Sequence, residues 1–251
     1  CADGMTSWWR GCRLPGQGGF QIWRCRPGLV DMARMPRLVV PGLPHHVTQR
    51  GARRMKTFFN TGDYLSYLDL IVEFKTIAGV DIWAYCLMPN HVHLVVVPEE
   101  KDSLAILFRH VHRLYTREIN VRQGCTGHLW QERYHSFVMD ESHLLATVRY
   151  AELNPVRARL CGRPEDWLWS SVHAHLAEED DAVVSVAPML QRVADWKVYL
   201  SQALNDSELE RIRAHGRSGR PAGDRGFVEQ LQLLTGKELI KRKPGPKRCI
   251  E

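Results

Sequence analysis

Strand-like and helix-like runs alternate between residues 37 and 176 in an order that few folds share. Runs rich in β-forming residues lie at 45–50, 80–87, 91–98 and 133–139. Amphipathic helical patterns lie at 63–79, from 103 onward and at 141–153. Only Pro89-Asn90 separates the second strand from the third, which predicts a hairpin, whereas helices separate the other strands. The order β-α-β-β-α-β predicts a ferredoxin-like, RRM-like α/β (α+β) sandwich with helices on one face of an antiparallel sheet.

The segments on either side of this core differ from it in composition. Residues 1–31 are rich in Gly and Arg and lack periodicity, so we expect a disordered or non-native leader, with Met32 or Met35 as a natural start. Residues 32–176 are expected to form the main domain. Residues 177–251 begin with an acidic linker and continue as a helical extension with a basic tail.

The basic charge of the chain is concentrated at its C-terminal end. The whole chain carries a net charge of +6. Residues 211–251 hold 11 Lys or Arg and 4 Asp or Glu, a net charge of +7, so the other 210 residues are close to neutral. A basic tail is typical of proteins with a polyanionic partner, although a solvated, disordered end is the alternative interpretation.

Composition argues against two other classes of protein. No apolar run approaches the roughly 20 residues that a membrane-spanning helix needs, so no membrane partner is expected. The seven cysteines are scattered and form no CxxC pair, which argues against a disulfide framework and a structural zinc site. This cysteine pattern favours a reducing, cytoplasmic compartment.

The run His91-Val92-His93 is the first candidate for chemistry. Alternate side chains of a strand share one face, so the two imidazoles are expected to project from the same side of the sheet. A single metal ion could then contact both rings. Two surface or hydrogen-bonded histidines are the plainer alternative.

Tyr115 is the second candidate, because it lies four residues after Val111 and therefore on the sheet-facing side of its predicted helix. We predict that it reaches the histidine strand. A divalent metal there would polarise a phosphodiester, and attack by the phenol oxygen would give a covalent phosphotyrosine. A core tyrosine is the alternative. If spacing is ignored, six other tyrosines are equally available: Tyr64, Tyr67, Tyr85, Tyr134, Tyr150 and Tyr199.

A third metal ligand with an oxygen atom is expected beside the two imidazoles, because hard divalent ions prefer oxygen. Glu118 lies three residues after Tyr115, and Asn120 lies five residues after it. The two rank nearly equally as predicted metal ligands.

Six runs of residues, taken in order, resemble the single-tyrosine HUH transposases, in the branch associated with repetitive extragenic palindromes (RAYTs). The runs are PGLPHHVTQRG at 41–51, AYCLMPNHVHL at 84–94, YTREIN at 115–120, GHLWQERY at 127–134, ELNPVRA at 152–158 and WSS at 169–171. An ordered set of six is far more specific than the two histidines alone.

The resemblance implies a metal-dependent single-stranded DNA endonuclease and strand transferase, acting at hairpin-associated sites with Mg²⁺ or Mn²⁺. His91 and His93 match the metal ligands, and Tyr115 is assigned the nucleophile that forms a 5′-phosphotyrosine. In such enzymes the third ligand lies about one helical turn beyond the tyrosine. Ile119 occupies that position and cannot ligate, so Glu118 and Asn120 both stay open.

The resemblance also implies partners and location. A DNA strand with hairpin or palindromic sites is the expected partner, a homodimer is a possible assembly, and a bacterial, nucleoid-associated cytoplasmic location follows. Trp130 is expected to stack an unpaired base, with a core-capping role as the alternative. The predicted phosphate contacts are Arg50, Arg53, Arg54, Arg133, Arg157, Arg220, Lys241, Arg242, Lys243, Lys247 and Arg248.

Two other functions remain open from the sequence. A non-catalytic DNA-binding or RNA-binding module of the same fold would keep the basic surface and lose the chemistry. A metal-dependent hydrolase that uses water would keep the histidines without needing Tyr115.

Overall fold

The computed structural model describes residues 37–202 and 204–240, all within a unit that spans Met35–Glu251. The predicted leader and the basic run beyond residue 240 lie outside the described residues.

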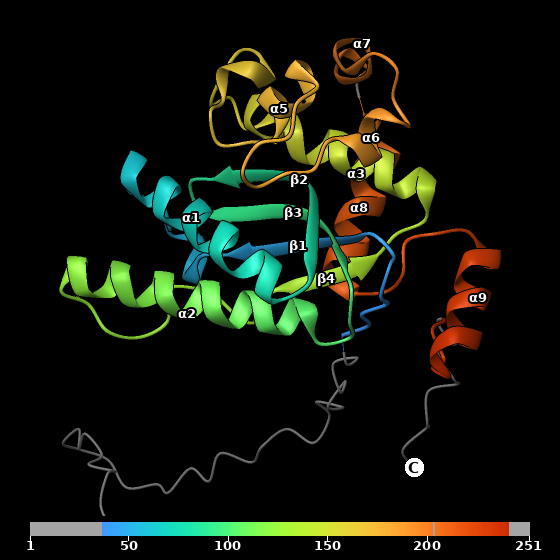
Figure 1. Cartoon of the computed structure of the whole chain (residues 1–251), viewed down its shortest axis with the longest axis horizontal. Coiled ribbons are helices and arrows are strands. Elements are labelled where there is room, and N and C mark those ends of the chain that lie inside the picture. The colour runs from blue at the N-terminus through green and yellow to red at the C-terminus, as the bar shows by residue number, and fades with distance from the viewer. Residues whose placement is uncertain (1–36, 203, 241–251) are drawn as a thin grey trace, which may run out of the picture. The chain divides into compact units, whose positions relative to one another are not determined.

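A four-stranded antiparallel sheet forms the centre of the described structure (Figure 1). Its strands are β1 (His45–Arg50), β2 (Val80–Met88), β3 (His91–Pro98) and β4 (His135–Val138). They lie in the order β2-β3-β1-β4, and each neighbouring pair is antiparallel. Helix α1 (Thr61–Ile77) connects β1 to β2, and α2 (Ser103–Gln123) connects β3 to β4. The predicted mixed α/β fold is therefore confirmed.

The predicted start of α1 is displaced by three residues. Asp63 was expected to cap this helix, but the capping residue is Asn60, whose side chain accepts a hydrogen bond from the Asp63 N–H. The Asp63 carboxylate in turn accepts the Asn60 N–H, which completes a capping box. A capping box has a polar residue at the N-cap and another three residues later. The sequence interpretation took the second of these, Asp63, for the N-cap.

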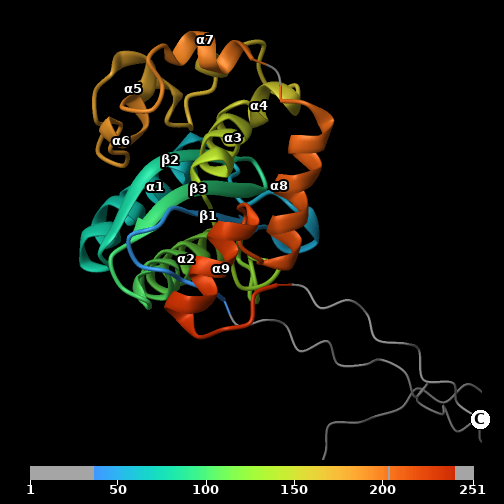
Figure 2. The same cartoon turned by 90° about the vertical axis from the view of Figure 1, so that its right-hand side faces the viewer.

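Different helices cover the two faces of the sheet. The apolar side chains Val92, Leu94 and Val96 of β3 pack with α1 and α2 in one core cluster. Val95 faces the other way, into a second cluster that includes Leu144 of α3. Figure 2 shows α3 and α8 at the sheet on the side away from α1 and α2. The C-terminal extension therefore helps to close the second face.

The remaining elements follow β4 in the chain, apart from one short turn after β1. That turn is η1 (Ala52–Arg54), and η2 (Pro164–Asp166) is a second 3₁₀ turn. The helices are α3 (Glu141–Glu152), α4 (Asn154–Arg157), α5 (Val172–Ala177), α6 (Ala187–Leu190), α7 (Trp196–Ser201), α8 (Asp206–Ser218) and α9 (Arg225–Thr235). Within the described ranges, no helix has the length and apolar character that crossing a bilayer requires.

His45 at the start of β1 predicts a stability loss in acid. Its Nε2 accepts the Val40 N–H at 3.1 Å and its Nδ1 donates to the Leu43 carbonyl at 2.7 Å, which suits only the neutral ring. Burial lowers the pKa of His45 from 6.5 to about 4. Between those values the unfolded chain binds a proton that the native ring excludes, so stability falls by up to about 1.4 kcal/mol per pH unit as the pH decreases.

Urea unfolding across this pH window tests that expectation. The variant His45→Gln removes the titrating group, so its unfolding free energy should fall less steeply than that of the wild type between pH 6.5 and about 4. Equal slopes in the two proteins would contradict the assignment.

Candidate functional site

The two histidines of β3 project from the face of the sheet that α3 covers. The side chains of β3 alternate, and the apolar ones at Val92 and Leu94 point toward α1 and α2. His91 and His93 therefore share the opposite face, as predicted, with ring centroids 4.9 Å apart. In the sheet register His93 pairs with Thr48 of β1, and His91 pairs with Arg50.

Asn154 is the residue that the structure adds to this pair. It lies at the start of α4, directly after the last turn of α3. Its side-chain Nδ2 is 2.8 Å from His93 Nε2 and 3.4 Å from His91 Nε2. One amide group thus contacts the same ring nitrogen on both histidines, and all three side chains converge on one point.

His91 and His93 both use Nδ1 for a hydrogen bond to another side chain, so the Nε2 atom of each ring is left to contact Asn154. His91 Nδ1 donates to the Asn90 side-chain oxygen at 2.7 Å, and Asn90 is oriented by its own N–H bond to the Arg54 carbonyl. His93 Nδ1 lies 2.9 Å from His46 Nε2, so one proton is shared between those two rings. Because the Asn154 amide donates to both Nε2 atoms, we assign the protons of His91 and His93 to Nδ1.

Burial keeps this histidine cluster neutral. It lowers the pKa of His91 to about 3, assisted by the nearby charge of Arg50, and lowers the pKa of His46 to about 3. Burial also lowers the pKa of His93 well below 6.5, and the neighbouring His91 lowers it further. Neutral imidazoles keep the lone pairs that metal ligation requires.

Tyr150 is held beside the histidines by contacts on three sides. It lies four residues before Asn154, on the last turn of α3, and its ring meets the His93 ring edge-on with centroids 5.5 Å apart. The Arg157 guanidinium lies 4.1 Å from the centre of the Tyr150 ring. Arg213 of α8 lines the same cavity and interacts electrostatically with the Tyr150 side chain. Tyr150 is thus held next to His93 and between two arginines.

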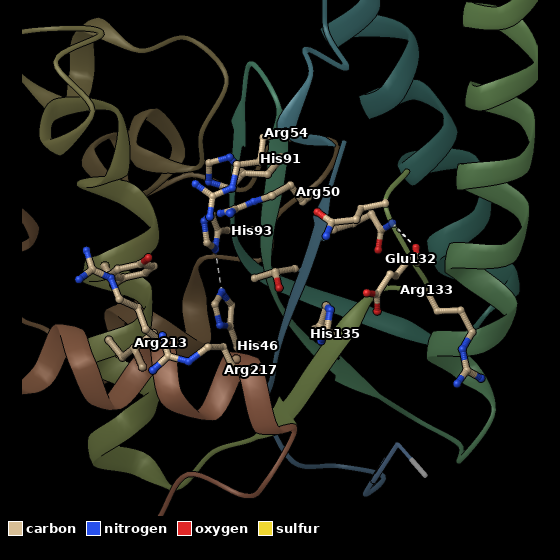
Figure 3. A pocket seen from close by; sticks show the side chains of 16 residues that line it. His46, Arg50, Arg54, His91, His93, Glu132, Arg133, His135, Arg213 and Arg217 are labelled. Atoms are coloured by element: carbon tan, nitrogen blue, oxygen red, sulfur yellow. Dashed lines mark hydrogen bonds between the residues drawn. The ribbon is translucent and has the colours of Figure 1, made fainter. Parts of the chain in front are cut away.

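A cavity of about 640 Å³ opens over these side chains (Figure 3). His91, His93 and Tyr150 form part of its lining. Five arginines also line it, from β1, the η1 turn, the segment before β4, and α8: Arg50, Arg54, Arg133, Arg213 and Arg217. Glu132 is the one carboxylate among the lining residues. This excess of positive charge fits a polyanion such as a nucleic acid backbone.

The η1 turn that carries Arg54 has an unusual backbone. Arg53 and Arg54 both adopt left-handed conformations, with φ of 54° and 62°. The turn folds back so closely that a Cβ on Gly51 would lie 2.3 Å from the Met55 carbonyl oxygen. Strain of this kind concentrates at functional sites, and here it brings Arg54 to the cavity.

Tyr115 is not brought to the histidines. It is fully buried in the core cluster between α2 and the opposite face of the sheet, and its hydroxyl donates to the Thr57 carbonyl at 2.7 Å. Burial raises the pKa of this phenol far above its ordinary value, which makes it a poorer nucleophile. Helical spacing correctly predicted that Tyr115 faces the sheet, but it could not show which face. The core-tyrosine alternative describes its position.

Glu118 and Asn120, the predicted third ligands, stay with Tyr115 on α2 and away from the histidines. The Glu118 carboxylate accepts a hydrogen bond from Ser66 of α1. The Asn120 side chain donates to the Gly127 carbonyl at 3.0 Å. Within residues 37–202 and 204–240, no group of three or more His, Cys, Asp or Glu side chains could hold a metal ion. An ion at the histidine pair would therefore need the Asn154 amide.

The predicted DNA contacts divide between the cavity and other places. Arg50, Arg54 and Arg133 line the cavity, whereas Arg157 packs on Tyr150 and donates to its carbonyl. Arg220 donates to the Leu239 carbonyl, and Arg53 is exposed in the η1 turn. Trp130 is buried in the α2 core cluster and also lines a second cavity. The other predicted contacts fall outside the described residues: Lys241, Arg242, Lys243, Lys247 and Arg248.

A buried carboxylate, that of Glu152, connects α3 to the segment that follows α4. Glu152 lies midway between Tyr150 and Asn154 in sequence, so it points to the opposite side of the helix. Its Oε1 accepts from Ser171 Oγ at 2.6 Å and from His175 Nδ1 at 2.7 Å, and its Oε2 accepts from Trp196 Nε1 at 2.9 Å. All three donors come from the segment after α4, which therefore sets the position of the site helix.

Replacing Glu152 with Ala should lower the free energy of unfolding by about 3 kcal/mol, because three buried donors lose their acceptor. Chemical denaturation measures this. The matched control is Glu141→Ala on the same helix, whose exposed ion pair with Arg192 should contribute less than about 1 kcal/mol. Similar losses in the two variants would show that the buried network does not hold α3.

Sequence reasoning missed several residues of the candidate site. Only some of them have a spacing in the sequence that could have indicated their position. Tyr150 and Asn154 have the spacing of one helical turn that the resemblance demands between tyrosine and third ligand, and that spacing was available in the sequence. Arg213 and Arg217 are also one turn apart, but nothing local indicates that α8 returns to the sheet. His46 has no spacing signal, because its contact with His93 crosses between strands.

Comparison with known proteins finds one matching family model and two solved structures with similarity to the chain. Residues 40–154 match the family model described as "Transposase IS200 like". Among solved structures, the chain resembles a REP-associated tyrosine transposase bound to a REP hairpin, with 21% identity and a TM-score of 0.51 over 61% of this chain and 92% of that one. A candidate transposase from Deinococcus radiodurans R1 has 19% identity and a TM-score of 0.34, over 53% of this chain and 96% of that one. The comparison with curated proteins found no match.

The matched segment begins just before β1 and ends at Asn154, so it contains the two histidines, Tyr150 and Asn154. The likeness to the REP-associated transposase supports the same fold. Residues 40–154 of the chain therefore resemble the family of IS200-like transposases.

Proposed function

We propose that the chain is a metal-dependent nuclease and strand transferase that cleaves single-stranded DNA through a covalent 5′-phosphotyrosine on Tyr150. The observation that carries the proposal is the contact of Asn154 with both histidines, while Tyr150, one turn earlier, packs against His93. The nucleophile role predicted for Tyr115 thus passes to Tyr150, and the third-ligand role passes to Asn154.

The donor set fits a divalent ion such as Mg²⁺ or Mn²⁺. His91 and His93 offer neutral Nε2 atoms, and the Asn154 amide presently caps both of them with its N–H groups. Turning that amide by half a rotation would present its oxygen, the ligand that hard ions prefer. When bound, such an ion would polarise the phosphodiester and stabilise charge on the departing oxygen.

The chain's own residues supply the rest of the reaction. The cavity arginines bind and orient the strand, and Arg213 together with Arg157 fixes the Tyr150 ring. The Tyr150 oxygen attacks phosphorus and the bond from phosphorus to O3′ breaks. The phenol proton passes to solvent, and the freed O3′ takes up a proton. Because one phosphodiester replaces another, attack by a second strand's 3′-hydroxyl reverses the step and transfers the strand.

The proposed substrate is single-stranded DNA that carries a hairpin. The REP-associated transposase of similar fold was determined bound to a REP hairpin, which supports this choice. We further propose that the predicted tail contacts from Lys241 to Arg248 add affinity for the phosphates.

Incubating the full chain with Mn²⁺ and labelled, hairpin-bearing single strands tests the proposal. We expect a labelled protein band on a denaturing gel that disappears when EDTA removes the metal. Cleaved DNA without a protein band would make water the nucleophile. Binding of the same strands with neither product would instead support the recognition module, and either result would overturn the proposed mechanism.

A further inference from the structure

A second cavity, of about 570 Å³, adjoins the first. It lies between α2 and the segment 128–134, which leads into β4. The two cavities share four lining residues, namely Gln49, Gln131, Glu132 and Arg133. The short segment 131–133 is therefore a wall with one cavity on each side of it.

This wall is tied to β1 and to the turn that follows it. The Gln131 N–H donates to the Arg50 carbonyl at 2.8 Å, and the Ala52 N–H donates to the Leu129 carbonyl at 2.8 Å. The buried Gln49 side chain donates to the Glu132 carbonyl at 2.6 Å. Since these bonds hold the wall to β1 and its following turn, the wall has a fixed position between the two cavities.

Aromatic rings form much of the lining of the second cavity. Phe108 of α2 packs against Tyr134 with ring centroids 4.8 Å apart, and His112 packs against Trp130 at 4.8 Å. The Trp130 Nε1–H is buried and has no hydrogen-bond partner among the described residues. Such surfaces bind flat π systems by stacking, and nucleobases are the flat π systems that a DNA strand carries.

Cations surround these rings. Arg37, Arg109 and Arg133 line the second cavity, and Arg37 lies 3.9 Å from the centre of the Tyr134 ring. Figure 3 shows the Arg133 side chain pointing away from the histidines, on the far side of the wall. Because Arg133 also lines the first cavity, it can contact a phosphate that lies between the two cavities. Rings inside and cations around them match a base with its flanking phosphates.

We propose that the second cavity binds one unpaired nucleobase of the strand whose phosphate lies at Tyr150, with the strand bending around residues 131–133. This inference rests on the proposed function for the position of the cleaved phosphate. The second cavity would then select one base close to the cleaved phosphate. Stacking of that base on the aromatic rings would provide the affinity of the cavity for it.

Binding measurements with the full-length Tyr150→Phe protein test this inference without cleavage. Strands with a single abasic site, moved one nucleotide at a time around the position that wild type cuts, are titrated against it. One abasic position should weaken binding about tenfold or more. At the same position, 2-aminopurine fluorescence should be quenched on binding, because the base stacks on the rings. A flat abasic scan with no quenching would overturn the inference.

A cavity-filling variant identifies the place where the base binds. Ala105 of α2 lines the second cavity, so Ala105→Phe in the Tyr150→Phe background should weaken binding of the intact strand about tenfold and abolish the abasic effect. Val121→Phe, at an exposed position of the same helix, is the matched control and should change neither. An abasic effect that persists in Ala105→Phe would place the base elsewhere.

The two proposals can fail separately. If wild type forms the covalent adduct while the abasic scan is flat, the base site is wrong and the proposed function stands. If wild type forms no adduct but the same scan around the hairpin gives one sensitive position that Ala105→Phe removes, the base site stands and the proposed chemistry is wrong.

Discussion

The variant Tyr150→Phe is expected to lose the covalent protein–DNA adduct completely, a decrease of more than about a thousandfold in cleavage, because the attacking oxygen is gone. The phenyl ring still packs against His93 and under Arg157, so the fold and DNA binding should change little. A denaturing gel with labelled strands measures the adduct, and a filter-binding titration measures the affinity.

Tyr115→Phe is the matched control for this experiment. It removes one buried hydrogen bond to the Thr57 carbonyl, at a cost of about 1 kcal/mol in stability, and should leave the adduct intact. The reverse result, with an adduct in Tyr150→Phe and none in Tyr115→Phe, would restore the nucleophile that the sequence spacing predicted.

Asn154→Ala is expected to lower metal-dependent cleavage by more than about a hundredfold, since even residues behind the ligands of a metal site change activity by about 10-fold to 100-fold. Raising the Mn²⁺ concentration should recover part of the activity, because the two histidines remain. Initial rates across a metal titration measure both effects.

Two alanine variants on α2 serve as controls for Asn154→Ala. Glu118→Ala removes a carboxylate and Asn120→Ala removes an amide, and both groups lie on α2, across the sheet from the histidines. The metal dependence of each variant should therefore match that of wild type. A shifted metal requirement in either variant, with none in Asn154→Ala, would show that the third ligand comes from α2.

The fold was predictable because its signals are local. The hairpin at Pro89-Asn90, the alternation of β3 and the helical periods of α1 and α2 each follow from a short run of residues. Their order predicts the antiparallel sheet that the structure has. The cap of α1 was misassigned by three residues, since a capping box places polar side chains at both Asn60 and Asp63.

The proposed site was only half predictable, because its side chains come from β3 and from segments far apart from it in the sequence. His91 and His93 follow from strand alternation alone. The same alternation points the Val92 side chain toward α1 and α2. The histidines on either side of Val92 therefore face away from Tyr115. Tyr150 and Asn154 could have been found by asking which tyrosine has a polar residue one turn later. The approach of Arg213 could not, because it depends on how α8 packs against α3 and β4.

Locating the DNA on the protein tests the central claim most directly. Wild type is trapped as its adduct, treated with nuclease and trypsin, and the tyrosine that retains a nucleotide is identified by mass spectrometry. The candidates separate cleanly, because cleavage after Arg113 and Arg117 releases Tyr115, while cleavage after Arg149 and Arg157 releases Tyr150. We expect the nucleotide on the peptide 150–157. A nucleotide on the peptide 114–117 would contradict the proposed site.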